Sequence, residues 1–166
     1  MSDSKPALDP ENTLHLDLKQ GRVVIQLLPD IAPMHVQQIK ALVRRGFYDG
    51  TVFHRVIEGF MAQGGDPTGT GTGGSDLDNI RADFSDKAKF VRGTCGMARS
   101  QSPNSANSQF FIMFEPASHL NGQYTIWGQV VEGMDFVDQI KRGSGGGGTV
   151  SNPEKIEKMT VAADAT

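Results

Sequence analysis

The sequence has little of what disulfide-rich, membrane-spanning or nucleic-acid-binding proteins need. One cysteine in 166 residues excludes an intramolecular disulfide and is compatible with a reducing compartment. No apolar run approaches the roughly 18 residues of a membrane span, and the first residues lack the apolar stretch of a secretory signal. The net charge of -3 argues against nucleic acid as the main partner. We therefore expect a cytoplasmic protein with neither a membrane nor a nucleic-acid partner.

The chain also lacks the residue spacings of a metal, cofactor or nucleophile site. No paired metal-ligand spacing relates the four histidines, His15, His35, His54 and His119. Cys95 has no neighbouring histidine and is expected to be a small buried hydrophobe. Residues 69–74 match a dinucleotide motif by letter, but neither a helical pattern nor a phosphate-binding lysine follows them. We expect a surface loop there, and no cofactor or metal.

What the chain does have is glycine and short stretches of strand periodicity. The length of 166 residues suits one domain, over residues 12–166, after a polar and flexible arm over residues 1–11. Alternation and turn residues predict strands over 13–18, 23–28, 51–56, 60–63, 94–99, 109–114, 126–131 and 155–161. Apolar spacing predicts helices over 33–45 and 134–142. Short strands with two helices predict a closed barrel or a sandwich, and the glycines of 143–148 predict a flexible connector.

Residues 53–66 carry polar side chains where apolar ones surround them. Arg55 and Gln63 stand as polar positions in two strand-like stretches. A functional role is one interpretation of this pattern. A surface ion pair of Arg55 with an acid such as Glu58 is the other, and the spacing alone leaves both open.

Residues 107–114 form a stretch with two apolar faces. Phe111 and Met113 alternate with Phe110 and Ile112. One face must enter the core of the barrel. The other face is either covered as well, as in a doubly buried strand, or free to bind a ligand.

Together these stretches resemble the cyclophilin family of peptidyl-prolyl cis/trans isomerases, in its bacterial cytoplasmic form. The resemblance covers about residues 12–162 and runs through Phe-His-Arg-Val-Ile-x-Gly-Phe-Met-x-Gln-Gly-Gly-Asp (53–66), Gly-Met-Ala-Arg (96–99), Asn-Ser-Gln-Phe-Phe-Ile (107–112) and Leu-Asn-Gly…Trp-Gly-Gln-Val (120–130). It implies a mainly β fold, a closed eight-stranded antiparallel barrel capped by two α-helices, with its groove on the outer face. It also implies rotation of X–Pro bonds in proline-containing peptides and in unfolded or flexible protein segments, which assists folding. We expect a monomer.

The resemblance assigns roles to individual positions. Arg55 matches the catalytic arginine. From the chemistry of the guanidinium, we expect Gln63 as the partner that fixes the direction of Arg55. The hydrophobic pocket for the substrate proline is matched by Phe60, Met61, Phe111 and Leu120. Other positions of the groove are matched by Gln63 and Gln109 as polar lining, by Gly71 and Ala98 near the residues preceding proline, and by Arg99 through its backbone.

Two positions depart from the pattern of many family members. His119 stands where many eukaryotic members carry a tryptophan that favours cyclosporin, so we expect weak cyclosporin binding. Tyr124 stands where many members have histidine, and a tyrosine can still form a wall of the pocket.

These residues suit a reaction that breaks no bond. When an X–Pro amide twists, resonance is lost and the lone pair returns to the prolyl nitrogen. The guanidinium of Arg55 can stabilise that lone pair or hold the prolyl carbonyl, because it is permanently charged and presents a planar fork of donors. Two other functions remain open: a proline-peptide binding module, which would not need Arg55, and a small-ligand barrel, which bulky apolar residues in the interior disfavour.

Overall fold

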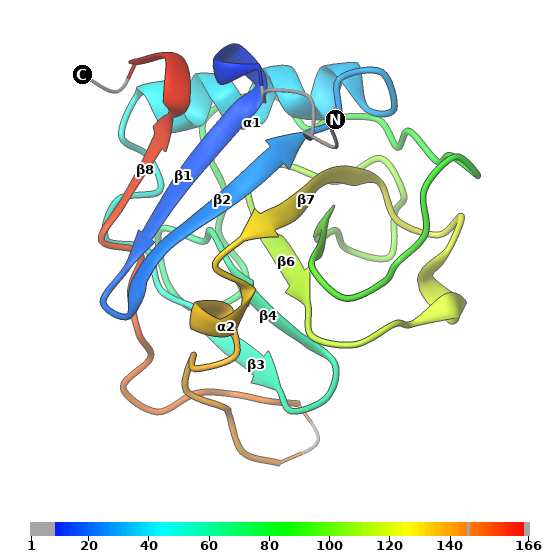
Figure 1. The fold of residues 1–166 in the computed structure, drawn as a ribbon. Coiled ribbons are helices and arrows are strands. Elements are labelled where there is room, and N and C mark those ends of the chain that lie inside the picture. Colours follow the sequence, from blue (N-terminus) through cyan, green and yellow to red (C-terminus); the bar gives the residue numbers. More distant parts are fainter. Residues whose placement is uncertain (1–8, 146, 165–166) are drawn as a thin grey trace, which may run out of the picture.

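A computed structural model of the chain describes residues 9–145 and 147–164, and in this part the strands form one curled antiparallel sheet (Figure 1). The strand order is β3-β4-β6-β5-β7-β2-β1-β8. The strands are β1 (Thr13–Leu18), β2 (Gly21–Leu27), β3 (Arg55–Ile57), β4 (Met61–Gly64), β5 (Thr94–Met97), β6 (Phe110–Met113), β7 (Ile126–Glu132) and β8 (Lys158–Val161). The helices are α1 (Pro33–Arg44) and α2 (Met134–Val137), with short 3-10 turns η1 (Pro10–Asn12), η2 (Ser118–Leu120) and η3 (Ala162–Asp164).

The hairpin of β1 and β2 follows directly from its leucine alternation. Leu14 and Leu16 are completely buried, while the alternate residues His15 and Asp17 face outward and are half-buried. Gly21 closes the turn with a φ of 152°. A Cβ at Gly21 would lie 2.6 Å from the ring of Phe136, so this position also needs glycine for packing. The turn of the hairpin therefore packs closely against Phe136 of α2.

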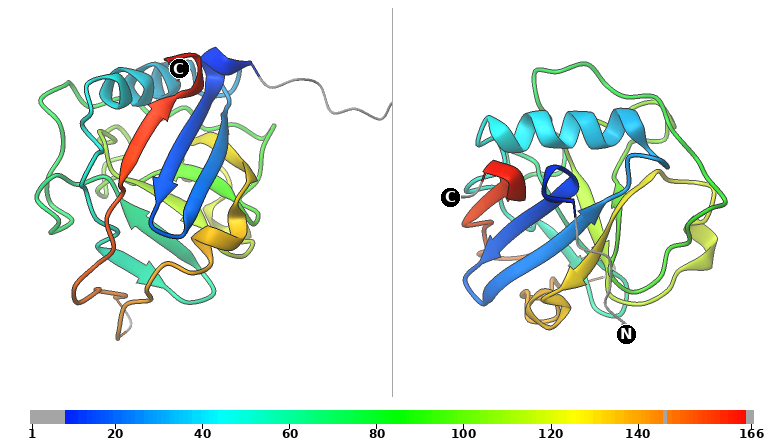
Figure 2. Two further views of the ribbon diagram at one scale, coloured as in Figure 1. Left: turned by 60° about the vertical axis from the view of Figure 1, so that its left-hand side comes forward. Right: turned by 45° about the horizontal axis from the view of Figure 1, so that its top comes forward.

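Helix α1 covers one end of the curled sheet, where it contacts β8 and β7 (Figures 1 and 2). Pro33 occupies the first turn, where its missing N–H costs nothing. The buried face consists of the expected stripe, Val36, Ile39, Leu42 and Val43, together with His35. The helix ends before Gly46, which has a φ of 72°. The prediction of a helix over 33–45 is confirmed to within one residue.

Aromatic side chains fill the interior of the barrel. Phe110 packs edge-on against Tyr48, Phe53 and Trp127, with ring centroids 5.6, 6.3 and 5.8 Å away. All four side chains have no exposed surface. A barrel that holds a small ligand would need open space where these rings lie. The packing therefore argues against that alternative.

The predicted mainly β fold with eight antiparallel strands and two helices is confirmed, but "closed" overstates the barrel. The edge strands β3 and β8 form no ladder with each other. Isolated bridges fill the gap instead, from Thr149 to Arg55 and from Lys155 to Val52. The segment that forms these bridges follows the glycines of 143–148 and contains Pro153, which has no N–H for a ladder. The seam is consequently irregular.

The second helix is shorter than the predicted range of 134–142. Beyond Val137 the chain tightens into three-residue turns, with N–H groups of Gln139 and Ile140 donating to the carbonyls of Phe136 and Val137, each at 3.1 Å. The last strand begins at Lys158 rather than at 155 because the preceding residues form the irregular seam.

Three predictions concern the flexible N-terminal arm, the glycine-rich connector and the absence of a membrane-spanning segment. Residues 1–8 of the predicted arm lie outside the described residues, and residue 146 of the predicted connector does too. Residues 10–12 form η1. Among the helices of the described ranges, none combines the length and the apolar character that crossing a bilayer requires.

Candidate active site

Strand β6 separates two hydrophobic clusters. Phe110 and Ile112 belong to the core inside the barrel. Phe111 and Met113 belong to a second cluster on the outer face, with Met61 of the paired strand β4 beside them. All four residues of β6 are buried, as the alternative of a doubly buried strand proposed. The outer cluster is nevertheless open on one side, where it forms the floor of a groove.

A cavity of about 320 Å³ opens at this outer cluster. Its lining consists entirely of residues that the sequence predicted for the site: Arg55, Phe60, Met61, Gln63, Ala98, Arg99, Phe111, His119, Leu120 and Tyr124. The apolar members form its base, and Phe111 and Leu120 are only 5% and 8% exposed. His119 is exposed at the rim, with its ring 6.0 Å from that of Phe60. The cavity has the size and character of a pocket for a small apolar ring.

Phe111 is held from behind by the predicted Tyr124 and by two residues that the sequence analysis missed, Phe90 and Gly96. Its ring stacks on Phe90 at 5.7 Å and meets the edge of Tyr124 at 5.8 Å. A Cβ at Gly96 would lie 2.7 Å from Phe111 and 2.8 Å from Phe90. Gly96 is part of the Gly-Met-Ala-Arg stretch, so its absence of a side chain was the available signal. The result is a rigid apolar wall.

Arg55 is fixed by two acceptors at the edge of this pocket. Its Nη1 donates to Oε1 of Gln63 at 3.2 Å, and its Nε donates to the carbonyl of Gly147 at 3.0 Å. Glu58 pairs with Arg142 instead. The alternative of a surface ion pair between Arg55 and Glu58 is therefore wrong. The contact to Gly147 brings in the glycine-rich segment, for which the sequence suggested no role beyond a connector.

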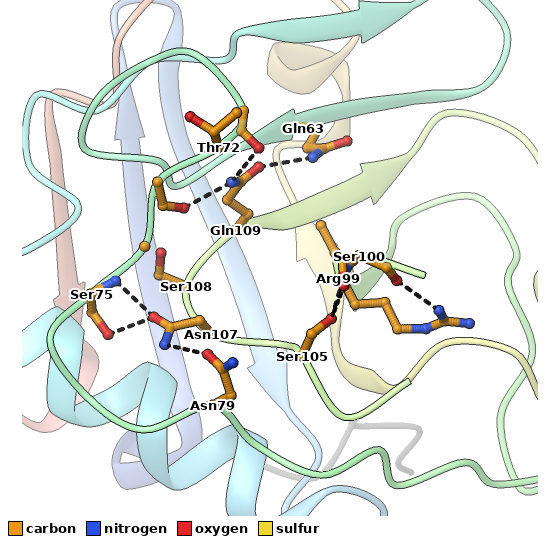
Figure 3. Close-up of a pocket in the computed structure, with 14 residues that line it drawn as sticks. Gln63, Thr72, Ser75, Asn79, Arg99, Ser100, Ser105, Asn107, Ser108 and Gln109 are labelled. Atoms are coloured by element: carbon orange, nitrogen blue, oxygen red, sulfur yellow. Dashed lines mark hydrogen bonds between the residues drawn. The ribbon is translucent and has the colours of Figure 1, made fainter. Parts of the chain in front are cut away.

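A second cavity, of about 550 Å³, adjoins the first and shares Gln63, Ala98 and Arg99 with it (Figure 3). The remaining two predicted residues, Gly71 and Gln109, line this cavity. The rest of the lining is mostly small or polar: Thr72, Gly73, Gly74, Ser75, Asn79, Ser100, Ser105, Asn107 and Ser108. The two cavities together form one groove with an apolar half and a polar half.

The side-chain amides of Gln63 and Gln109 cross the boundary between the two halves (Figure 3). Nε2 of Gln63 donates to Oε1 of Gln109 at 3.0 Å. Nε2 of Gln109 then donates to the carbonyls of Gly71 and Gly73, at 3.0 and 2.9 Å. A continuous row of hydrogen bonds thus runs from the loop over residues 68–73, called the glycine loop below, to Arg55.

Arg99 braces the wall of the apolar pocket with its side chain. Its guanidinium lies 4.4 Å from the centre of the Tyr124 ring. It also donates twice to the carbonyl of Gln123, from Nε at 3.2 Å and from Nη2 at 2.6 Å. The predicted backbone contact of Arg99 to a peptide stays a prediction, as do the roles of the other site residues.

Asp66 is a further residue that the sequence analysis did not select. Its side chain has no exposed surface. Burial raises the pKa of the carboxyl, but hydrogen bonds from the backbone of Gly73, Thr68 and Gly71 and from the Thr68 hydroxyl outweigh this and lower the pKa to about 2. Two signals were available: Asp66 ends the 53–66 stretch that carries the family resemblance, and with Pro67 it precedes a run that alternates threonine and glycine.

Other reactive groups do not gather at the groove. Within residues 9–145 and 147–164, no group of three or more His, Cys, Asp or Glu side chains is placed to hold a metal ion. Cys95 has no exposed surface, as predicted, and burial raises the pKa of its thiol. What the groove offers is an apolar binding surface and the fixed cation of Arg55.

The chain is similar to known proteins over nearly its whole length. A family model described as cyclophilin type peptidyl-prolyl cis-trans isomerase/CLD matches residues 13–161. A probable peptidyl-prolyl cis-trans isomerase of Brucella suis is 58% identical over 95% of this chain and 86% of its own length. The crystal structure of the cyclophilin AquaCyp293 from Hirschia baltica superposes with a TM-score of 0.87 at 28% identity, covering 97% of this chain and 77% of its own. A cyclophilin-type isomerase of Cryptosporidium parvum, crystallised in the presence of the dipeptide Ala-Pro, superposes with a TM-score of 0.83 at 30% identity, covering 90% of this chain and 98% of its own.

Proposed function

The chain belongs to the cyclophilin-type peptidyl-prolyl cis-trans isomerase family, and from this premise we propose that it acts through Arg55 in the groove on the outer face of the sheet. The chain is a peptidyl-prolyl cis-trans isomerase, which rotates X–Pro bonds in peptides and proteins and thereby assists folding. Its family binds proline-containing peptides. What we propose here is the part of each residue in that reaction.

The reaction is a rotation about a bond that amide resonance holds planar. The barrier is about 18–20 kcal/mol, and uncatalysed exchange takes roughly 10–100 s at room temperature. No bond breaks, so the enzyme has to favour the twisted amide over the planar one. The twisted amide differs from the planar one in two ways: its C–N dipole is smaller, and its prolyl nitrogen carries a localised lone pair.

The apolar pocket acts on the first difference. The ring of the substrate proline rests on Phe111 and Leu120, where little water reaches. Such surroundings disfavour the planar, more polar amide more than the twisted one. The Cryptosporidium parvum relative was crystallised in the presence of the dipeptide Ala-Pro, which supports a proline-containing ligand for this chain. Holding the ring also leaves only the preceding acyl group to rotate.

Arg55 acts on the second difference. Its guanidinium donates to the lone pair of the prolyl nitrogen as the amide twists, or holds the prolyl carbonyl while the acyl group turns. The observation that carries this proposal is the placement of Arg55 at the edge of the apolar pocket, with Nη1 on Gln63 and Nε on Gly147. Its remaining N–H donors are the ones that meet substrate.

The size of the effect limits what one residue can supply. A hydrogen bond to a charged group contributes about 1.5–3 kcal/mol. At about 1.36 kcal/mol for each factor of ten, this corresponds to one to two decades of rate. Positioning and exclusion of water must supply the rest.

The test is cis-to-trans isomerisation of an Ala-Pro-Phe peptide by the natural protein and by Arg55→Ala. We expect turnover to fall at least about tenfold in the variant, because the donor to the twisted amide is lost. Arg22→Ala is the matched control, since Arg22 pairs with Asp17 on the β1–β2 hairpin, away from the groove. Unchanged turnover in a folded Arg55→Ala protein would contradict the role of Arg55. A protein that binds the peptide without accelerating exchange would instead be a proline-binding module.

We also propose that cyclosporin binds weakly, because His119 stands at the rim where an indole would offer a larger ring and an N–H donor. Calorimetry should give a dissociation constant well above the nanomolar range. His119→Trp is expected to tighten binding by about tenfold. A low-nanomolar constant for the natural sequence would refute this proposal.

We propose, finally, that the enzyme works as a monomer in the cytoplasm. The single buried cysteine supports a reducing compartment. Light scattering at working concentration should give a mass near 17.9 kDa, and a dimer mass would contradict the monomer. Fractionation of the source cells tests the compartment.

A further inference from the structure

The hydrogen bonds that join the loop over residues 68–73 to Arg55 through Gln109 and Gln63 can run in only one donor-to-acceptor direction. The backbone carbonyls of the loop determine that direction. A carbonyl oxygen only accepts hydrogen bonds, so Gly71 and Gly73 require the NH₂ end of Gln109 to face them. The oxygen of Gln109 must then face Gln63 and accept from its NH₂ group. This leaves the oxygen of Gln63 for Arg55, at 3.2 Å from Nη1. The glycine loop therefore decides that an acceptor, and not a donor, meets the guanidinium.

The loop is in turn held by one buried carboxylate. Oδ2 of Asp66 accepts from the backbone N–H groups of Gly71, Gly73 and Thr70, at 2.6, 3.1 and 3.2 Å. Oδ1 accepts from both the N–H and the hydroxyl of Thr68, each at 2.8 Å. Two of these N–H groups belong to Gly71 and Gly73, the residues whose carbonyls bind Gln109. A shift of the carboxylate therefore shifts the carbonyls that orient the amides.

The loop over residues 68–73 lies so close to the Asp66 carboxylate that no side chain fits between them at Gly73. A Cβ at Gly73 would lie 2.2 Å from Oδ1 of Asp66, so the loop passes directly over the carboxylate. Five donors converge on one fully buried side chain. The charge-assisted hydrogen bonds of such a cluster are short and directional. An uncharged side chain of the same size offers one acceptor oxygen in place of two and introduces an NH₂ group that faces other donors.

We propose that Asp66 is a positioning residue for the isomerase reaction: its carboxylate sets the loop over residues 68–73, the loop orients Gln109 and Gln63, and Gln63 aims Arg55. The Asp66 carboxylate is not hydrogen-bonded to Arg55 and does not line the apolar pocket, so we propose that it acts on Arg55 through the loop and the two amides. The proposal rests on the role of Arg55 given above.

The first experiment compares Asp66→Asn with the natural protein on the Ala-Pro-Phe peptide. We expect kcat to fall about three- to tenfold, because the guanidinium loses its fixed direction, while KM changes by less than about twofold because the apolar pocket is intact. Asp49→Asn is the matched control. Asp49 also accepts a backbone N–H, from Met159 at 2.9 Å, but it lies on another segment. Unchanged kcat in Asp66→Asn, or an equal loss in Asp49→Asn, would overturn the proposal.

The second experiment asks whether Asp66 acts through Gln109. In Gln109→Leu the row of amides is broken, so adding Asp66→Asn should lower kcat no further. A loss that multiplies in the double variant would show that Asp66 acts by another route and would overturn the proposal. The side-chain NH₂ resonances of Gln63 supply a direct signature. They should shift in Asp66→Asn, although the two side chains are not in contact, and should stay in place in Asp49→Asn.

A variant from the loop side keeps the proposal testable if Asp66→Asn does not fold. Gly73→Ala forces the loop away from the same carboxylate without changing any charge, and it should lower kcat and shift the Gln63 resonances in the same way. The outcome also separates the two proposals. If Arg55→Ala is inactive but neither Asp66→Asn nor Gly73→Ala lowers kcat, only the positioning role fails. If Arg55→Ala is fully active, the proposed function of the groove fails first.

Discussion

Arg55 illustrates how a long, flexible side chain becomes a fixed donor. One acceptor, Oε1 of Gln63, comes from the neighbouring strand, and the other, the carbonyl of Gly147, comes from 92 residues further along the chain. Two hydrogen bonds at different nitrogens restrict both rotation and translation of the guanidinium. The loss of side-chain entropy is thereby incurred on folding and not again when substrate binds.

The sequence identified Arg55 and Gln63 but not what holds them. Both stood out because they are polar in apolar strands, and their pairing follows from the register of β3 with β4. Gly147, Asp66 and Gly96 were not selected, because each acts through a backbone carbonyl, a buried carboxylate beneath a loop or the absence of a side chain. A local pattern alone reveals none of these three roles. They depend on which distant segments come together.

Phe111 links the stability of the outer cluster to binding. In Phe111→Ala we expect the affinity for a proline peptide to fall about tenfold and turnover to fall with it, because the floor of the pocket is removed. Calorimetry and the isomerisation assay measure the two effects. Phe84→Ala is the matched control, since Phe84 is 44% exposed and lies outside this pocket. Equal affinity before and after the change at Phe111 would contradict its place in the pocket wall.

At the scale of elements, the glycine-rich segment between α2 and β8 packs against β3. The N–H of Val56 donates to the carbonyl of Gly148 at 2.9 Å, and the N–H of Gly143 donates to the carbonyl of Val56 at 2.8 Å. The segment thus serves as an irregular partner for an edge strand. The carbonyl of Gly147, the residue before Gly148, accepts the hydrogen bond from Nε of Arg55.

This arrangement predicts different effects for two glycines of the same segment. Gly148→Ala should lower the melting temperature and turnover together, because its Cβ would lie 2.5 Å from Ile57 at a φ of 72°. Gly145→Ala has a similar φ of 71° but nothing within 4 Å. It should cost only the backbone strain of about 1–2 kcal/mol and leave turnover unchanged. Thermal melts and the isomerisation assay test both variants, and identical behaviour would show that the segment does not support Arg55.

Periodicity predicted the elements that have a repeating buried face. The range of β1 and nearly all of α1 were correct because alternate or every third and fourth side chain enters the core. It failed where backbone geometry decides, as at α2, which ends in tight turns after Val137, and at the start of β8. The incomplete closure between β3 and β8 could not be predicted either, since it depends on how two distant edges meet.

At the scale of the molecule, the barrel is a filled scaffold that carries its site outside. The core cluster of aromatic side chains holds β6 in place from within, while Phe111 on the same strand faces the groove. A small displacement of the core therefore moves the floor of the pocket. Stability and activity should respond together to changes inside the barrel.

The buried carboxylate of Asp66 makes the free energy of unfolding of the whole fold depend on pH in the acid range. Its pKa is about 2 in the folded chain, against 3.8 for an unperturbed aspartate. The lowered value means that the stabilisation is complete above about pH 4 and is lost as the pH falls toward 2, and it amounts to about 2 kcal/mol. In urea unfolding, Asp66→Asn should be less stable than the natural protein at pH 6, and the gap should narrow at pH 3. A gap that stays constant with pH would contradict the buried, ionised state.

The most direct test of the account separates rotation from binding in the groove. Exchange NMR on a saturating Ala-Pro-Phe peptide measures cis/trans interconversion of the bound peptide, and a titration on the same samples gives its dissociation constant. Comparing the natural protein with Arg55→Ala, we predict that interconversion slows at least about tenfold while the dissociation constant changes by less than about threefold. Bound-state interconversion at the same rate in both proteins would contradict the account, because Arg55 would then serve binding alone.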